Sequence, residues 1–240
     1  KFKQIFEGNK SAYGQLVLSG ETTDKGKAIG KAFIKREPIP DTFWQDHIDG
    51  KEPALGVIPI NEKNECRWGC IDVDEYKGLD HKKITASIKS HKFPLVTFRS
   101  KSGGAHLFLF AKEFIPASLM QSKLKAMAEA LGYAGSEIFP KQTKLLLEKG
   151  DRGNILNMPY FGGSSSTRYC HNDDGEGILD LDEFITHCKS KQITKRELEN
   201  LTAKAINTAD SDPDLEGSPP CLRSLCVMGF PEGTRNDPKN

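Results

Sequence analysis

The four residues Ile71 to Asp74 alternate apolar and acidic side chains, and this short pattern constrains the fold more than any other part of the chain. Successive side chains of a β-strand point to opposite faces, so a strand here buries Ile71 and Val73 and directs both aspartates to the other face. Two carboxylates this close repel each other unless a cation lies between them. Because carboxylate oxygens select hard divalent ions, Asp72 and Asp74 predict a Mg²⁺ or Mn²⁺ site of the two-metal phosphoryl-transfer kind. A strand end with two solvated aspartates is the alternative.

A basic segment with two consecutive glycines follows, RSKSGGAH at residues 99–106. The apolar runs on either side predict strands over residues 95–98 and 106–110, which makes this segment a hairpin turn. The glycines let the backbone turn sharply and approach a ligand closely. Backbone N–H, hydroxyl, ammonium and guanidinium donors can form a concave phosphate site, and the candidate nucleotide-binding residues are Arg99, Lys101, Ser102, Gly104 and His106. An ordinary hairpin with polar side chains is the alternative.

A third candidate motif, SEIFPKQ, lies at residues 136–142. Glu137 precedes an apolar pair and a proline, so we expect it in a short strand. It is a candidate to complete a carboxylate triad with Asp72 and Asp74, and Lys141 is a candidate nucleotide-binding residue that supplies positive charge to phosphates. A surface glutamate near a turn is the alternative.

The composition fits a globular protein with its own core. The chain has 240 residues, of which 37% are hydrophobic and 28% charged, which is enough for one large domain. Its 34 Lys and Arg residues nearly balance 33 Asp and Glu residues, which excludes a globally basic nucleic-acid coat. No apolar stretch approaches the length of a membrane span, and the start lacks the apolar core of a signal peptide. We therefore expect a soluble protein without a membrane partner in the cytoplasm, the host's cytoplasm if a phage or plasmid encodes it.

Hydrophobic periodicity predicts a mixed α/β (α+β) fold. Apolar runs predict strands at residues 54–60, 68–73, 95–98, 106–110 and 154–158. Helical spacing predicts helices at residues 44–48, 84–90, 118–131, 181–189 and 194–209. Asp180 and Thr194 precede the last two helices as N-caps, and Glu197 completes a capping box with Thr194. We expect an α/β domain at residues 1–190, then a helical extension at residues 191–240 with an acidic, proline-containing linker at 210–220.

Four segments in this order and spacing, IDVDEY, SKSGGAH, SEIFPKQ and GNILNMPYFGG, resemble the archaeo-eukaryotic primase superfamily, and most of all its phage and mobile-element primase-polymerases. The likeness covers roughly residues 40–190. It implies a two-lobed primase-polymerase catalytic domain with an RRM-like sheet at residues 1–190. It also implies that residues 191–240 hold a helical extension, a linker and the start of a truncated C-terminal helical domain.

The resemblance also implies roles for individual residues. Asp72 and Asp74 are then ligands of two metal ions, and His106 holds the phosphates of the incoming nucleotide. Glu137 takes the position of the third acidic ligand, where many relatives have aspartate. The implied activity is that of a DNA primase and DNA polymerase, which makes and extends primers on single-stranded DNA by template-dependent nucleotidyl transfer from NTP or dNTP substrates. A replicative helicase domain or protein is a partner that such an enzyme can have.

Two other classes of protein remain open. A metal-dependent nuclease also uses a set of three acids, but it does not need a turn that binds a triphosphate. A noncatalytic nucleic-acid-binding module of replication could keep the same fold without binding a metal.

The charged residues are unevenly distributed along the chain. Residues 77–101 contain seven Lys and Arg against one Asp, so they form the candidate surface for a nucleic-acid backbone. A solvated helix face explains them equally well. Residues 172–183 contain six acids and no Lys or Arg, so we expect them to face away from nucleic acid or toward a partner. These residues superficially track a calcium loop, but a turn that leads into the capped helix fits them better.

The six cysteines are too scattered for a disulfide framework. On a regular strand Cys66 and Cys70 lie about 13 Å apart at about 3.3 Å per residue, which is too far for both to bind one zinc ion. We therefore expect reduced, buried thiols and no structural zinc.

Overall fold

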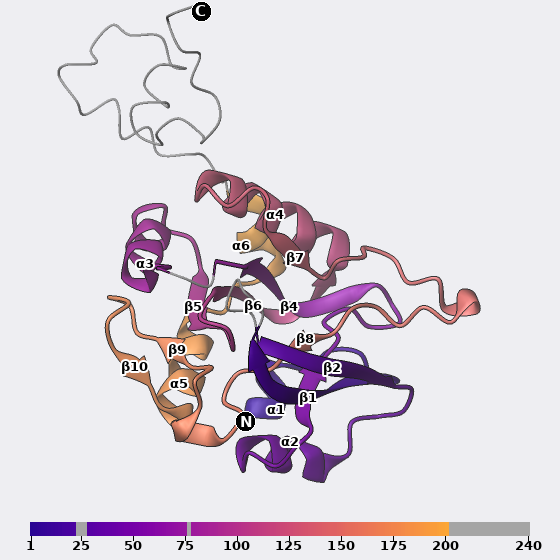
Figure 1. Ribbon diagram of the computed structural model, residues 1–240. Coiled ribbons are helices and arrows are strands. Elements are labelled where there is room, and N and C mark those ends of the chain that lie inside the picture. Colours follow the sequence, from indigo (N-terminus) through magenta and orange to yellow (C-terminus); the bar gives the residue numbers. More distant parts are fainter. Residues whose placement is uncertain (23–27, 76–77, 202–240) are drawn as a thin grey trace, which may run out of the picture. The chain divides into compact units, whose positions relative to one another are not determined.

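The computed structural model describes residues 1–22, 28–75 and 78–201, which form two antiparallel β-sheets with flanking helices (Figure 1). The strand order of the smaller sheet is β2-β1-β3-β8, with β1 Tyr13–Thr22, β2 Ala28–Lys35, β3 Ala54–Val57 and β8 Leu156–Asn157. The strand order of the larger sheet is β10-β9-β5-β6-β4-β7, with β4 Glu65–Val73, β5 Leu95–Arg99, β6 Ala105–Pro116, β7 Glu137–Phe139, β9 Cys170–His171 and β10 Ile178–Leu179. The expected mixed α/β fold is confirmed.

The helices of the described residues flank these sheets. The α-helices are α1 Phe2–Ile5, α2 Asp41–Ile48, α3 His81–Ser90, α4 Ala117–Ala130, α5 Leu181–Lys191 and α6 Lys195–Asn200. Two short 3₁₀ helices are η1 Leu147–Lys149 and η2 Gly163–Ser165. None of the helices in the described part of the chain is long and apolar enough to cross a membrane.

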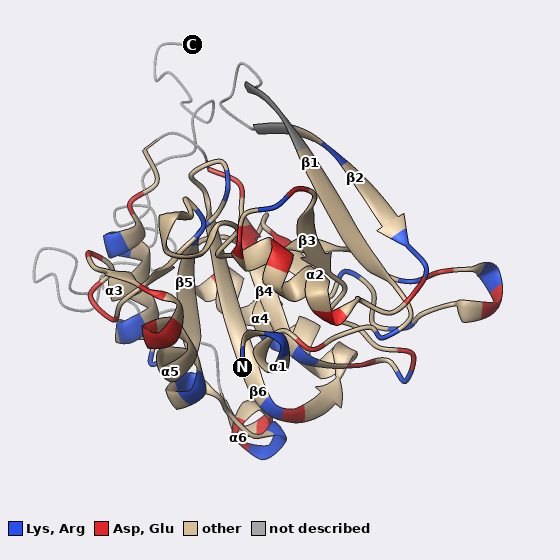
Figure 2. Ribbon diagram, turned by 90° about the horizontal axis from the view of Figure 1, so that it is seen from below, with Lys and Arg blue, Asp and Glu red and all other residues tan. Residues whose placement is uncertain are grey.

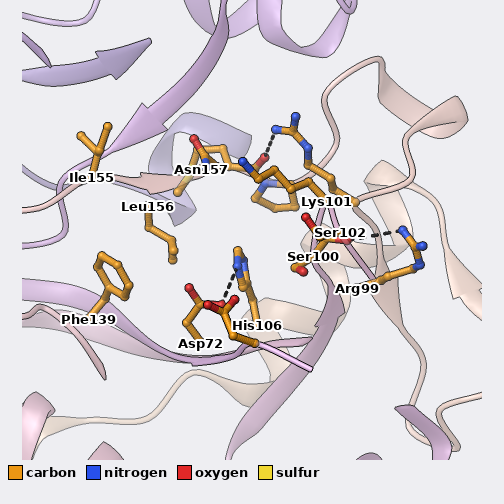
Figure 3. Close-up of a pocket in the computed structure, with 14 residues that line it drawn as sticks. Asp72, Arg99, Ser100, Lys101, Ser102, His106, Phe139, Ile155, Leu156 and Asn157 are labelled. Atoms are coloured by element: carbon orange, nitrogen blue, oxygen red, sulfur yellow. Dashed lines mark hydrogen bonds and ion pairs between the residues drawn. The ribbon is translucent and has the colours of Figure 1, made fainter. Parts of the chain in front are cut away.

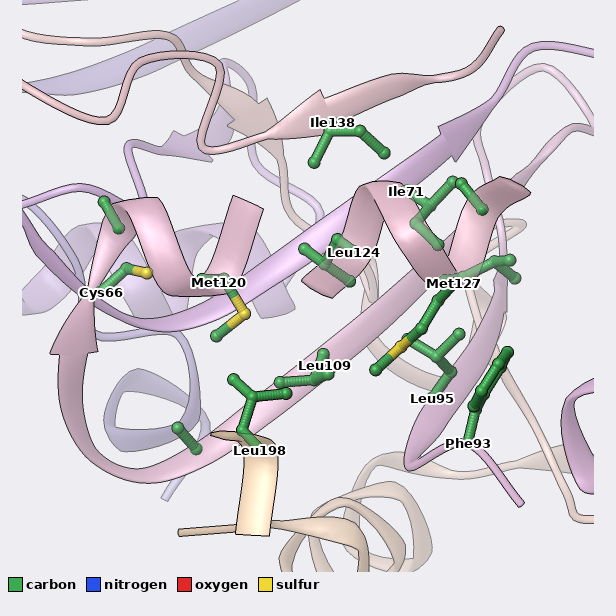
Figure 4. Packing of buried hydrophobic residues seen from close by; sticks show 14 of the residues in the cluster. Cys66, Ile71, Phe93, Leu95, Leu109, Met120, Leu124, Met127, Ile138 and Leu198 are labelled. Atoms are coloured by element: carbon green, nitrogen blue, oxygen red, sulfur yellow. The ribbon is translucent and has the colours of Figure 1, made fainter. Parts of the chain in front are cut away.

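Alternation along the central strands gives the larger sheet two different apolar faces. Ile71 and Leu109 belong to a cluster beneath α4 that includes Leu124 and Met127 (Figure 4). Phe108, the neighbour of Leu109 on β6, points the other way into an aromatic cluster shared with side chains of β1, β3 and β8. Because both faces are buried, a slip of one residue would exchange the two sets of side chains, and burial therefore fixes the strand register.

Strand β4 is irregular at its beginning. The pairing of β4 with β6 shifts between Cys66 and Trp68, and Cys66 packs in the cluster beneath α4 while Cys70 packs in the aromatic cluster. The assumption that one regular strand carries both thiols on the same face was therefore wrong, because the irregularity turns Cys66 away. The thiols of Cys66, Cys70, Cys170 and Cys188 are free and buried, as expected.

The predicted helices agree with the structure at α2 to α5, where bounds differ by a few residues. Asp180 accepts from the backbone N–H of Glu183 at 2.9 Å, and Thr194 accepts from that of Glu197 at 3.2 Å, so both capped helix starts are confirmed. Helix α6 ends at Asn200 rather than at residue 209, since Leu201 is extended. The rest of that prediction and the linker at 210–220 lie outside the described residues.

Strands β1 and β2 were not predicted, and β3 is shorter than the expected 54–60. Glycine is uncommon inside a strand, but Gly14 serves a close approach between β1 and the residue just before β8. A Cβ atom on Gly14 would lie 2.7 Å from side-chain carbons of Ile155. Such a contact is too short for carbon atoms, so only glycine lets β1 pass this segment.

A buried histidine joins helix α2 to the segment after β8. His47 is 0% exposed, and its Nδ1 accepts the backbone N–H of Leu55 at 2.9 Å. Its Nε2 therefore carries the proton and donates to the backbone oxygen of Pro159 at 2.8 Å. Burial, together with the nearby charge of Arg168, lowers the pKa of His47 to about 4.

Replacing Leu124 with alanine is expected to destabilise the domain strongly. Leu124 is 0% exposed beneath the larger sheet, so truncation loses apolar burial and leaves a cavity that costs about 2–5 kcal/mol. Leu147→Ala is the matched control, because Leu147 is 37% exposed and should lose less than about 1 kcal/mol. Urea unfolding followed by circular dichroism measures both, and equal losses would contradict the burial of Leu124.

Replacing His47 with glutamine is expected to weaken the pH dependence of stability. An unfolded histidine titrates near pH 6.5, so between about pH 6.5 and 4 the unfolded chain binds a proton that folded His47 refuses. The free energy of unfolding therefore falls as the pH falls through this window. Glutamine cannot titrate, so His47→Gln should remove up to about 1.4 kcal/mol per pH unit from that slope. Urea unfolding between pH 7 and pH 5 measures the slope, and an unchanged slope would refute a neutral His47.

Candidate active site

Three of the predicted site residues lie side by side on neighbouring strands. In the register of the larger sheet, Asp72 on β4 is opposite His106 on β6 and opposite Glu137 on β7. Directly opposed residues of antiparallel strands have Cα atoms about 4.5–5.5 Å apart, and their side chains share a face. The sheet thus assembles three residues that are far apart in the sequence into one row.

The centre of this row is a contact between Asp72 and His106 (Figure 3). The His106 Nε2 atom lies 3.2 Å from the Asp72 Oδ1 atom, and the side chains are 13% and 16% exposed. Both residues line a pocket between the sheets with a cavity volume of about 140 Å³. Asp74, just beyond the end of β4, lines the same pocket.

The wall of the pocket comes from both sheets. The hairpin between β5 and β6 supplies four consecutive residues, and β8 with the segment after it supplies the opposite side. The lining residues beyond the two aspartates and His106 are Arg99, Ser100, Lys101, Ser102, Phe139, Ile155, Leu156, Asn157, Met158, Pro159 and Arg168. Four of the predicted nucleotide-binding residues are therefore together here: Arg99, Lys101, Ser102 and His106.

Glycine allows the hairpin to approach the aspartates. Gly103 has a φ of +93°, and the backbone N–H of Ser100 donates to the Gly104 oxygen at 2.8 Å across the turn. A Cβ atom on Gly104 would lie 2.4 Å from the Val73 oxygen, so no larger residue fits against the end of β4. Because Gly104 has no side chain, the turn can lie against the end of β4, and its basic residues come close to the two aspartates.

Helix α3 and the segment before β9 hold the hairpin in place. His81 Nε2 donates to the Gly104 oxygen at 3.1 Å, and its ring stacks on that of His171 with a centroid distance of 4.8 Å. The Arg99 guanidinium donates to the Thr167 oxygen at 2.8 Å and lies 3.4 Å from the Ser100 oxygen. Burial lowers the pKa of His171 to about 4, and the charges of His81 and Arg99 add to this effect.

Glu137 and Lys141 lie apart from the main pocket. Their side chains form an ion pair at 2.7 Å, and that of Glu137 is 57% exposed. Glu137 lines a second, shallower cavity of about 300 Å³, which also touches Asp72 and Asp74 from the other side. The two aspartates therefore separate the pocket with the basic hairpin from the cavity with Glu137.

The donor chemistry suits a hard divalent cation, but the third acid is turned aside. Asp72 and Asp74 offer carboxylate oxygens to the pocket, the ligand type preferred by Mg²⁺ and Mn²⁺. Among the residues that the structure describes, no three His, Cys, Asp or Glu side chains are close enough together to hold a metal ion. To bind a cation together with the aspartates, the Glu137 carboxylate would have to leave its ion pair with Lys141.

Two polar residues of the pocket were missed by sequence reasoning. Arg168 is 5% exposed, and burial lowers its pKa to about 10. Asn157 has a buried Oδ1 atom that finds no hydrogen-bond partner among the described residues. Asn157 lies within the GNILNMPYFGG segment, whose likeness to primases was a signal for the segment but not for the residue. Arg168 follows a serine-rich loop, and nothing in its spacing marks it.

Comparison with known proteins identifies the family. A family model described as the archaeo-eukaryotic primase domain of the TOTE conflict system matches residues 4–207. A comparison with curated proteins found no match. Primases of this superfamily act on nucleotides and nucleic acid, which agrees with a basic hairpin beside paired carboxylates. Because the match covers most of its length, the chain belongs to the archaeo-eukaryotic primase superfamily, in the branch found in conflict systems.

Proposed function

We propose that this domain is a DNA primase-polymerase that makes and extends primers on single-stranded DNA in the cytoplasm, using NTPs or dNTPs. One observation carries the proposal: the pocket joins Asp72 and Asp74 to the basic hairpin and His106. A polymerase needs acidic groups at the reacting phosphate and cationic groups at the polyphosphate that leaves. Membership of the primase superfamily supports nucleotidyl transfer as the reaction class.

The residues of the pocket divide the work. Asp72 and Asp74 would hold Mg²⁺ or Mn²⁺, which supply activation of the attacking hydroxyl and neutralisation of phosphate charge. Lys101, Ser102 and the Gly104 backbone would bind the β- and γ-phosphates of the incoming nucleotide. In the reaction, the primer 3′-oxygen loses its proton to solvent and bonds to the α-phosphorus. The bond between the α-phosphorus and the oxygen that bridges it to the β-phosphorus breaks, and pyrophosphate leaves.

His106 has two tasks in this arrangement. At 3.2 Å from Asp72 Oδ1, its Nε2 holds the carboxylate in one orientation, and a protonated imidazole can also donate to a phosphate. Arg99 and Lys141 are the further candidates for phosphate binding. The Arg99 guanidinium donates to backbone oxygens, and Lys141 bonds to Glu137, so either cation would give up a present partner to a nucleotide.

The polar lining of the pocket indicates which part of a nucleotide it would hold. Arg99, Lys101 and Ser102 line it beside the two aspartates. These donors suit phosphate oxygens, so the phosphates would lie inside while the sugar and base reach the mouth. There the base can pair with a template.

The template surface that we propose is α3. Lys83, Lys89 and Lys92 are exposed on or just after this helix, and Figure 2 shows its basic residues in blue. Lys82 instead forms an ion pair with Glu176, so the acidic turn at residues 172–177 lies against α3 rather than away from it. Since His81 at the start of α3 touches the hairpin, a strand bound along this helix would lead to the pocket. A replicative helicase remains a proposed partner on the family likeness alone.

Replacing Asp72 with asparagine is expected to abolish synthesis while keeping the fold. Asparagine has the same shape and can still bond His106, but it removes the negative charge, so incorporation should fall at least about 10²-fold. The assay is template-dependent incorporation of labelled dNTPs and NTPs on single-stranded DNA with Mg²⁺ or Mn²⁺. Asp182→Asn is the matched control, because Asp182 is an exposed residue of α5.

Other outcomes of this assay favour the other classes. DNA cleavage that depends on Asp72, without synthesis, would assign a nuclease. Binding of single-stranded DNA without any metal-dependent chemistry would assign a noncatalytic module. Full synthesis by Asp72→Asn would overturn the proposal.

Replacing Glu137 with glutamine tests the third metal ligand. If Glu137 leaves Lys141 to bind a cation, Glu137→Gln should lower incorporation about as much as Asp72→Asn and should raise the Mn²⁺ concentration needed for half-maximal rate. Glu148→Gln, at an exposed glutamate of η1, is the control. An unchanged Mn²⁺ requirement would restrict Glu137 to its contact with Lys141.

A further inference from the structure

A buried guanidinium forms part of the pocket wall that β8 and the loop after it supply. Arg168 is 5% exposed and lines the same pocket as Asp72 and His106. Its backbone is fixed, because its oxygen accepts from the Tyr160 N–H at 2.7 Å and its N–H donates to Ser166 Oγ at 3.1 Å. The charged side chain therefore starts from a backbone position that is held by hydrogen bonds on both sides.

This cation has weak compensation within the described part of the protein. No carboxylate there forms an ion pair with Arg168, and its Nη1 lies 3.5 Å from the Met158 oxygen, a long distance for a hydrogen bond. Its Cζ atom lies 5.3 Å from the centre of the Phe161 ring, which offers a cation–π contact. A buried charge without a counterion is costly, so a fold that keeps one commonly presents it to an anionic ligand.

The same wall holds a second unsatisfied group. The Asn157 Oδ1 atom is buried and has no partner in the part of the chain that the structure describes, and Asn157 also lines the pocket. Buried polar atoms are nearly always bonded, so two under-compensated groups on one wall indicate a polar ligand between them and the aspartates. Burial leaves the pKa of Arg168 at about 10, so the side chain is still charged at neutral pH.

Arg168 differs in this respect from the other arginine of the pocket. The Arg99 guanidinium donates to the backbone oxygen of Thr167, the neighbour of Arg168, and so fastens the loop of Arg168 to the hairpin. The Nη1 atom of Arg99 therefore has a well-formed bond at 2.8 Å, whereas the guanidinium of Arg168 has only the long 3.5 Å polar contact among the residues that the structure describes. A guanidinium has the planar, forked geometry that binds two phosphate oxygens at once.

We propose that Arg168 is a binding residue for the polyphosphate tail of the nucleotide, held in position by Arg99. The inference rests on the proposed function, which places a nucleoside triphosphate in this pocket. It adds a residue from the opposite wall to the hairpin donors, so that the phosphates are held between two sides. The ligand class is an anion with at least two linked phosphates.

The test uses inorganic tripolyphosphate as the probe, with metal-free buffer and the whole chain. Wild type and three variants, Arg168→Met, Arg168→Lys and Arg196→Met, are compared by calorimetric titration. We expect Arg168→Met to lose about 10- to 100-fold in affinity, the size of a lost charge-assisted contact, and Arg168→Lys to lose less. Arg196 is exposed on α6, so its variant should bind as wild type does.

Thermal unfolding separates ligand binding from a structural role. If Arg168 is kept for the ligand, Arg168→Met removes an under-compensated buried charge, and its midpoint without ligand should equal or exceed that of wild type. A lower midpoint, a failure to fold, or tripolyphosphate affinity equal to that of wild type would each overturn the inference. So would a wild-type protein that does not bind tripolyphosphate.

These readouts are independent of synthesis. Loss of tripolyphosphate affinity in Arg168→Met, in a protein that shows no template-dependent incorporation, would retain the anion site and reject the polymerase. Incorporation that depends on Asp72, together with unchanged tripolyphosphate affinity in Arg168→Met, would retain the polymerase and reject the role of Arg168.

Discussion

The register of β4 between β6 and β7 is the constraint on which the rest of the site depends. It sets Asp72 opposite His106 on one side and Glu137 on the other. This register is fixed by burial on both faces, because Ile71 must lie beneath α4 while Cys70 lies among the aromatic side chains. If one face of the strand were exposed to solvent, a shift in register would bury fewer wrong side chains and would cost less free energy. The chemistry of the pocket is thus tied to the packing of the core.

The hairpin between β5 and β6 follows from the same sheet. Its approach to the end of β4 is set by Gly104, and its far side is held by His81 of α3 and by backbone bonds to residues 167 and 169. Three separate segments therefore support a turn of a few residues. Such support matters for a phosphate site, since donors bind an anion well only when they are already in place.

Much of this arrangement could be predicted from local sequence patterns. The alternation around Asp72, the glycine pair and the capping residues Asp180 and Thr194 are local signals, and the structure shows the strand, turn and helices that they indicate. Strand β1 could not be predicted, because glycine is uncommon inside a strand and the contact of Gly14 with Ile155 is long-range. Long-range packing, which no local pattern encodes, decides such cases.

The same reason explains the missed residues of the site. Arg168 owes its surroundings to burial and to its contact with the Phe161 ring, and the Asn157 Oδ1 atom owes its surroundings to burial. The direction of the Glu137 side chain was also beyond sequence reasoning, since the contact with Lys141 competes with a position beside the aspartates. The face on which each strand side chain lies was accessible to pattern analysis, whereas the choice among side-chain partners was not.

The pocket lies between two sheets that contribute different things. The larger sheet carries the acids and His106, while β8 and the loop after it carry Asn157, Pro159 and Arg168. Strand β8 pairs with β3 over two residues, and among the described strands none of the larger sheet pairs with it. Substitutions in β8 and the loop after it can therefore change one side of the pocket while the row of Asp72, His106 and Glu137 stays intact. Related chains can therefore differ on one side of the pocket while they keep the acidic residues and the histidine on the other side.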